Sequence, residues 1–103
     1  MKTVYVIVHK DCVRVSRKTH ELATPVYEEI QRIEREEEFY RAHFLDKVPK
    51  KLPKPSSDLV VKVCGAFTRK SGDGCVDQFV ETLQRAGYQP VTHEAGTLKS
   101  RFY

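Results

Sequence analysis

The residues best suited to chemistry lie in a short loop and at the start of the helix that follows it. Cys75 takes the first helical position, directly after a loop that spans residues 68–74. Unpaired N–H groups and the helix dipole place partial positive charge at a helix start, so a thiol there ionises more easily. Cys75 is therefore a candidate catalytic nucleophile.

The same loop is a candidate anion site, because backbone N–H groups at a helix start bind phosphate. The predicted binding residues in and just before the loop are Gly65, Thr68, Arg69, Lys70, Gly72 and Gly74. Their spacing matches neither the GxxxxGK[ST] phosphate loop nor the dinucleotide-binding fingerprint. The alternative is structural: Cys75 is then a small, partly buried residue, and the glycines only turn the chain.

Two further polar residues, His9 and Asp11, follow the first predicted strand, residues 3–8. Ligands of open α/β sheets bind beyond the carboxyl ends of the strands, so their position makes His9 and Asp11 candidate site residues, with a predicted binding role for His9. The alternative is a polar strand end at the surface.

The strands that position these residues follow from apolar and β-branched runs. Residues 3–8 are apolar on both faces, which predicts a central strand, and residues 12–15 either prolong it past a bulge or belong to the loop. Residues 39–45 are interpreted as a strand, with continuation of the preceding helix as the alternative. Residues 59–64 predict a strand covered on both faces. Pro90 places the last short strand, residues 88–93, at an edge of the sheet.

Two helices follow from apolar residues at helical spacing. Thr24 is a suitable N-cap and Pro25 a suitable first residue for one helix, whose acidic residues 34–38 are expected to be solvated. Its predicted buried stripe consists of Val26, Ile30 and Ile33. The other helix starts at Cys75 and ends at Gly87. Its predicted stripe consists of Val76, Phe79, Val80, Leu83 and Ala86.

The element order β-α-β-β-α-β predicts a single α/β domain over residues 1–103 with a small, mostly parallel, Rossmann-like sheet in two or three layers. Residues 48–55 contain three prolines, which excludes regular structure there. Residues 94–103 are expected to form a tail that docks Leu98, Phe102 and Tyr103 on the body or on a second subunit. With only two helices, one face of the sheet is thinly covered, so a homo-oligomer such as a dimer is expected.

Composition limits the partners. The net charge is +4, and basic residues cluster at 10–18 and 47–54. A basic surface suits phosphates, so the chain is either a small-ligand protein or a non-catalytic module for nucleic acid or another polyanion, with a structural subunit as a further alternative. A small-molecule or anionic ligand is preferred to nucleic acid. No asparagine is present and Glu, Lys and Arg abound, which is typical of a heat-adapted source, a thermophile.

The three cysteines are an odd, sparse set, so no disulfide framework is expected. No CxxC or HxxxH spacing is present, and we therefore expect neither a metal site nor a cofactor. No apolar run is long enough to cross a membrane. The N-terminal segment is interpreted as a strand rather than a secretion signal, so we expect a cytoplasmic protein.

The central segment resembles the core of the isochorismatase-like cysteine hydrolases, which include nicotinamidases. That core combines an apolar strand, a Gly-x-x-Thr turn, a Cys-Val pair that opens a helix, and a Gly-Tyr pair at the helix end. The matching residues here are Gly65, Thr68, Cys75, Val76, Gly87 and Tyr88. The resemblance implies a parallel α/β fold, a cysteine hydrolase activity and Cys75 as the nucleophile.

The family also uses an Asp at the end of the first strand and a Lys before the turn-bearing strand, so the resemblance implies a catalytic role for Asp11 as the group that accepts the proton of the Cys75 thiol. Asp11 matches the Asp approximately, a few residues late, whereas Lys50, Lys51 and Lys54 only lie in the right region. The family chain is much longer, and the loop before Cys75 is longer here than in the family. The resemblance therefore implies a reduced relative that kept the fold and lost or changed the chemistry, with a ligand pocket at the strand ends.

Overall fold

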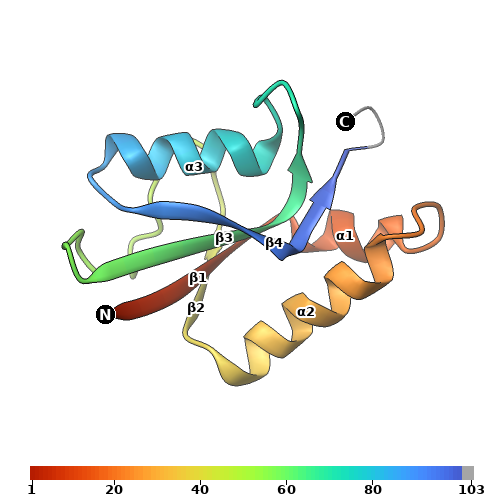
Figure 1. Ribbon diagram of the computed structural model, residues 1–103, viewed down its shortest axis with the longest axis horizontal. Coiled ribbons are helices and arrows are strands. Elements are labelled where there is room, and N and C mark those ends of the chain that lie inside the picture. Colours follow the sequence, from red (N-terminus) through yellow and green to blue (C-terminus); the bar gives the residue numbers. More distant parts are fainter. Residues whose placement is uncertain (101–103) are drawn as a thin grey trace.

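Four parallel strands form a sheet in the order β2-β1-β3-β4 in the computed structural model, which describes residues 1–100 (Figure 1). The strands are β1 (Lys2–Val8), β2 (Phe39–Ala42), β3 (Leu59–Thr68) and β4 (Pro90–Lys99). The helices are α1 (Lys10–Ser16), α2 (Ala23–Glu36) and α3 (Cys75–Arg85). The predicted α/β class with a parallel, Rossmann-like sheet is confirmed.

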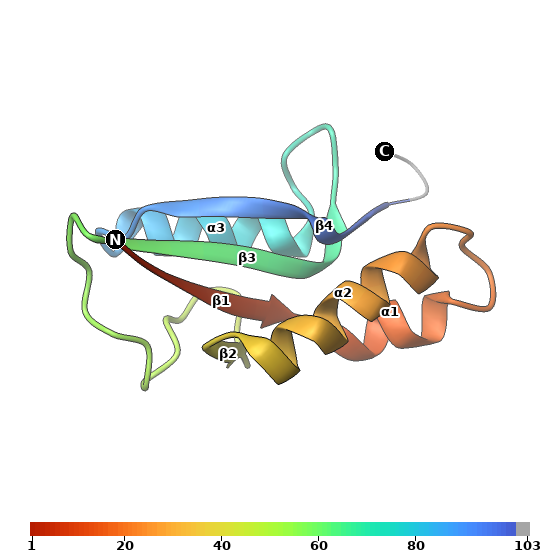
Figure 2. The ribbon, with the colours of Figure 1, turned by 60° about the horizontal axis from the view of Figure 1, so that its bottom comes forward.

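Helices cover both faces of the sheet, which gives three layers (Figure 2). Val4, Val6 and Val8 of β1 pack on the side of α3, whereas Tyr5 and Ile7 pack on the side of α1 and α2. All five side chains are buried, so β1 is a central strand, as predicted. Both faces therefore have a helical cover within one chain, and the predicted homo-oligomer stays a prediction.

Helix α1 corrects the expectation that residues 12–15 prolong β1 or form a loop. His9, with φ 50° and ψ 52°, turns the chain away from the sheet, and α1 begins at the next residue. Val13 is fully buried and Val15 is 59% exposed. Two residues apart, these valines would share a face of a strand but lie on different sides of a helix. A helix of 7 residues is too short for its apolar spacing to show in the sequence.

Helix α2 begins earlier than predicted. It starts at Ala23 after Leu22, which makes no side-chain cap, so the prediction that Thr24 caps this helix is wrong. Pro25 still lies in the first turn, where its missing N–H group leaves no helical hydrogen bond unmade. The predicted stripe is buried as expected, but Glu34 is not solvated, because its side chain is only 15% exposed.

Strands β3 and β4 are longer than predicted. Gly65 and Thr68 belong to β3 rather than to a turn, and β4 continues to Lys99 where a tail was expected. A bulge hides this continuity, since Val63 pairs with Thr92 but Gly65 pairs with Thr97. After the bulge Leu98 is buried in the core, as expected, whereas Phe102 and Tyr103 lie outside the described residues.

The other expected elements match the structure. Residues 39–42 form the predicted strand, although it stops short of 45, and residues 48–55 contain neither helix nor strand. Helix α3 starts at Cys75, and Gly87, with φ 90°, follows its end as predicted. Its buried residues are Val76, Phe79 and Leu83, whereas Val80 is half-buried and Ala86 is exposed. Pro90 opens β4 at the edge of the sheet.

A charged cluster holds the bulge of β4 against α2. Glu29 accepts hydrogen bonds from Arg32 at 2.7 and 2.9 Å, and His93 Nε2 lies 2.6 Å from the same carboxylate. The hydrogen bonds from Arg32 are the main reason that the pKa of Glu29 falls from 4.5 to about 2, with His93 adding to the effect against the cost of burial. A carboxylate with a lowered pKa stabilises the fold only while it is ionised.

We predict that Gly65→Ala destabilises the protein by more than about 3 kcal/mol, measured by urea denaturation. A Cβ atom at Gly65, where φ is +123°, would lie 1.8 Å from the carbonyl oxygen of Val8. Gly72→Ala is the matched control, because Gly72 also has a positive φ but nothing lies within 4 Å of its Cβ position. Its expected cost is about 1–2 kcal/mol. Equal losses in the two variants would contradict the packing argument.

A second prediction concerns pH. Glu29→Gln is expected to lower the free energy of unfolding by about 1–3 kcal/mol at neutral pH, because it replaces the charged carboxylate that accepts from Arg32 with a neutral amide that has one acceptor oxygen. The stabilisation by Glu29 is complete above its ordinary pKa of 4.5 and is lost as the pH falls towards about 2. The difference between wild type and variant should therefore shrink over that range in denaturation curves. Glu36→Gln, at an exposed ion pair with Arg35, should show no such trend.

Candidate ligand-binding site at the strand ends

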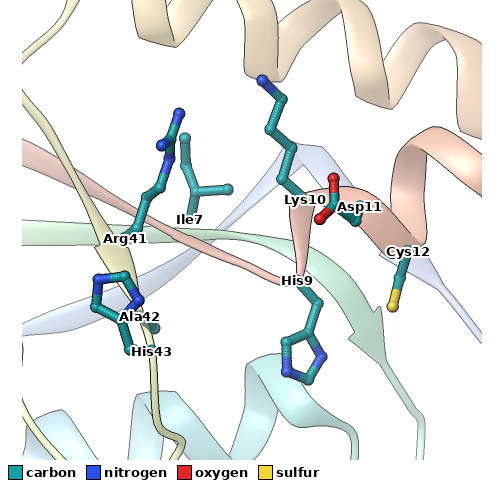
Figure 3. Close-up of a pocket in the computed structure, with 8 residues that line it drawn as sticks. All are labelled: Ile7, His9, Lys10, Asp11, Cys12, Arg41, Ala42 and His43. Carbon is teal, nitrogen blue, oxygen red and sulfur yellow. The ribbon is translucent and has the colours of Figure 1, made fainter.

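A cleft of about 520 Å³ opens at the carboxyl ends of β1 and β2 (Figure 3). Its lining residues are Ile7, His9, Lys10, Asp11, Cys12, Arg41, Ala42 and His43. They come from two neighbouring strands and from the first turn of α1, so the parallel sheet brings them together. This is the edge at which open α/β sheets bind ligands.

Glu34 of α2 anchors two cations of this cleft. Its carboxylate accepts hydrogen bonds from Lys10 Nζ at 2.7 Å and from an Arg41 Nη atom at 2.9 Å. Burial opposes ionisation of Glu34, but the hydrogen bonds from Lys10 and Arg41 outweigh it, so its pKa lies below the ordinary value. The ionised Glu34 therefore fixes one cation from α1 and one from β2 on the same side of the cleft.

A second cleft of about 530 Å³ adjoins the first and shares Arg41 and His43 with it. It runs along the outer edge of β2 and the connector that follows. Its lining residues are Tyr40, Arg41, His43, Phe44, Lys47, Val48, Pro49, Lys50 and Lys51. We call the two clefts together the basic groove.

The basic groove contains an exposed aromatic side chain. Phe44 is 60% exposed, and Lys47 Nζ lies over its ring, 4.9 Å from the ring centroid. The cations that line the groove are Lys10, Arg41, Lys47, Lys50 and Lys51. Asp11 is the only acid among the described lining residues, and its side chain is 87% exposed beside Arg14, whose Nε lies 3.6 Å away. The groove thus combines an excess of positive charge with an accessible π-face.

The predicted loop site is closed by a residue of its own helix. Asp77 accepts hydrogen bonds from the Thr68 hydroxyl at 2.8 Å and from the N–H groups of Arg69 and Gly74 at 2.9 and 3.0 Å. Thr68, Arg69 and Gly74 therefore converge, but on this carboxylate. Two of the backbone donors expected to bind a ligand anion already bind an internal one.

The other predicted site residues divide between two places. His9 and Asp11 line the strand-end cleft, whereas Cys75 and the loop residues do not. Gly65 lies inside β3, and the N–H of Gly72 donates to the Arg69 carbonyl. Lys70 is exposed at the tip of the loop. The structure thus brings the expected histidine and aspartate into a cleft without the expected cysteine.

Burial makes the thiols of Cys64 and Cys75 harder to ionise. It raises the pKa of Cys75, with a smaller contribution from Cys12, and it raises the pKa of Cys64 to about 12. A nucleophilic thiol needs the opposite shift. The predicted catalytic roles of Cys75 and Asp11 stay predictions.

Sequence reasoning missed Arg41, His43 and Phe44 as site residues. It placed all three inside a strand over residues 39–45, whereas β2 ends at Ala42 and leaves His43 and Phe44 outside the strand. The available signal was the polar residue after the strand, the same signal that identified His9. Ending the strand one residue before His43 would have placed two histidines at neighbouring strand ends.

No protein-family model, curated protein or solved structure shows significant similarity to this chain. Over residues 1–100, no group of three or more His, Cys, Asp or Glu side chains is arranged to hold a metal ion. In the same part of the chain, no helix has the length and apolarity to span a membrane. The candidate site therefore rests on its own geometry.

We predict that iodoacetamide near neutral pH modifies Cys12 first, Cys75 more slowly and Cys64 slowest. Cys12 is exposed, whereas burial raises the pKa of the other two thiols. Mass spectrometry of the alkylated peptides over time measures the three rates. If Cys75 reacts fastest instead, its thiolate is stabilised in solution, and the nucleophile hypothesis gains direct support.

Proposed function

We propose that this protein binds single-stranded nucleic acid in the basic groove. The observation that carries the proposal is Phe44, an exposed ring with Lys47 over it in a groove lined by further cations. Proteins that hold single strands without sequence preference combine a cationic groove for the phosphates with aromatic rings on which bases stack. The groove supplies both components along one edge of the molecule.

A polymer fits the groove better than a small anion does. Lys50 and Lys51 extend the positive charge along the connector, while Arg41 and Lys10 continue it to the strand ends. Lysines spread in this way match phosphates that repeat along a chain, and each neutralised phosphate adds to affinity through counterion release. A single strand is favoured because its unstacked bases can reach the ring of Phe44.

The cysteine hydrolase hypothesis finds less support in the geometry. The pKa of Cys75 is raised, Asp77 occupies the N–H groups of Arg69 and Gly74, and neither Cys75 nor the loop lines the strand-end cleft. A basic binding module was the alternative that the charge distribution had already raised. We therefore place the function in the groove.

We predict that the protein binds a fluorescein-labelled 12-nucleotide DNA strand in an anisotropy titration. With four phosphates neutralised by Arg41, Lys47, Lys50 and Lys51, affinity should fall roughly 50-fold between 50 and 200 mM salt. Phe44→Ala should weaken binding roughly 5- to 150-fold through lost stacking, whereas Phe44→Tyr should bind like wild type.

Lys18→Ala is the matched control for charge, because Lys18 is exposed and lies outside both clefts. Lys50→Ala should lower the salt slope by about 0.7, whereas Lys18→Ala should leave it unchanged. If affinity is unchanged in Phe44→Ala and falls equally in Lys50→Ala and Lys18→Ala, the interaction depends only on the net charge of the protein and the proposed groove is wrong. If inorganic phosphate binds in the strand-end cleft and no oligonucleotide displaces it, the result would favour a small anionic ligand instead.

A further inference from the structure

Two histidines occupy equivalent positions on neighbouring strands. Ile7 pairs with Arg41 and Val8 with Ala42, so His9 and His43 each follow the last paired residue of their strand. Both side chains line the strand-end cleft. Figure 3 shows the His9 imidazole at the end of β1 and the His43 imidazole at the end of β2, with the side chains of Arg41 and Lys10 directed away from the His9 ring.

Neither imidazole makes a hydrogen bond or an ion pair within residues 1–100, the part of the chain that the structure describes. His93 is tied to Glu29, and His20 lies 3.1 Å from the Lys99 carbonyl and accepts from the Leu22 N–H. His9 and His43 are exposed and have no hydrogen-bond or ion-pair partner among residues 1–100. The two histidines without partners are thus the two that face one cleft.

The backbone of His9 is held in an unusual conformation. Its left-handed φ and ψ are uncommon for a residue with a side chain and cost about 1–2 kcal/mol. Glycine would fit this turn without strain. Strained backbone at a cleft points to a functional demand on the side chain, since nothing in the packing requires a histidine at this turn.

We propose that His9 and His43 form a general acid–base pair that cleaves RNA bound in the basic groove. This inference rests on the proposed function and names its substrate class. Imidazole is the side chain that exchanges protons most readily between pH 5 and 8, and one group must gain a proton while another loses one.

The reaction needs no other reactant. One imidazole accepts the proton of a ribose 2′-hydroxyl, whose oxygen forms a bond to the adjacent phosphorus. The bond from phosphorus to the 5′-oxygen breaks, and the imidazolium of the other histidine gives its proton to that oxygen. The products are a 2′,3′-cyclic phosphate and a free 5′-hydroxyl end, so charge and protons balance. DNA lacks the nucleophile and is bound without being cleaved.

The test uses the full chain and a labelled 12-nucleotide DNA strand that contains a single ribonucleotide. Wild type should cleave it at the ribonucleotide and leave a cyclic phosphate, identified by mass spectrometry. His9→Asn and His43→Gln should each slow cleavage by a factor of about 10²–10⁴. Asparagine suits position 9 because it tolerates the left-handed backbone. His20→Gln is the matched control, since His20 lies outside both clefts, and it should cleave like wild type.

Binding of the all-DNA strand separates the two proposals. Loss of cleavage by a far larger factor than any loss of binding, in both His9→Asn and His43→Gln, supports the acid–base pair. Tight binding by wild type without cleavage overturns the pair and leaves the proposed function standing. Equal cleavage by the doubly substituted protein, purified in the same way, also overturns it, because the activity is then a contaminant. Absence of binding removes the proposed function and this inference with it.

Discussion

The carboxylate of Glu34 is the interaction on which the strand-end cleft depends. It joins α2, the start of α1 and the edge strand β2 through Lys10 and Arg41. Strand β2 has only four residues and a single strand neighbour, so side-chain contacts of this kind matter more for it than for β1. Without the carboxylate, two cations would face each other at the cleft without compensation. The half-buried carboxylate of Glu34 thus determines where the cationic groups of Lys10 and Arg41 lie.

The sequence predicted the parts of the fold that depend on long apolar patterns. The apolar run of β1, which is buried on both faces of the sheet, and the apolar stripe of α3 were recognisable because the pattern of buried residues repeats over several positions. It failed where a short element or an irregularity breaks the pattern. Helix α1 buries only Val13, and the bulge of β4 inserts residues between Thr92 and Thr97 that no period can accommodate. His9 and Asp11 were predictable as strand-end residues, whereas His43 was missed because the aromatic residues that follow favoured a strand up to residue 45, and β2 ends at Ala42.

The two candidate sites differ in what already fills them. At the start of α3, Asp77 supplies a negative charge from within the chain and uses the nearby N–H donors. At the ends of β1 and β2, the compensating Glu34 lies behind the cations and leaves the cleft side open. The residue types of a loop indicate which hydrogen-bond donors it offers, but they do not show whether a side chain of the same protein already accepts from those donors. The glycine and cationic residues of the loop therefore gave no sign that Asp77 accepts hydrogen bonds from the N–H groups of Arg69 and Gly74.

The bulge in β4 has a consequence for solubility. A parallel sheet ends in edge strands whose free N–H and C=O groups invite pairing with another chain. At one edge β2 is short. At the other, Pro90 opens a strand of ten residues without an N–H donor, and the bulge after Thr92 interrupts this strand. The Thr97 hydroxyl donates to the carbonyl of His93 within the bulge and occupies one of its acceptors. The irregularity that concealed β4 in the sequence therefore protects the longer edge from intermolecular strand addition and aggregation.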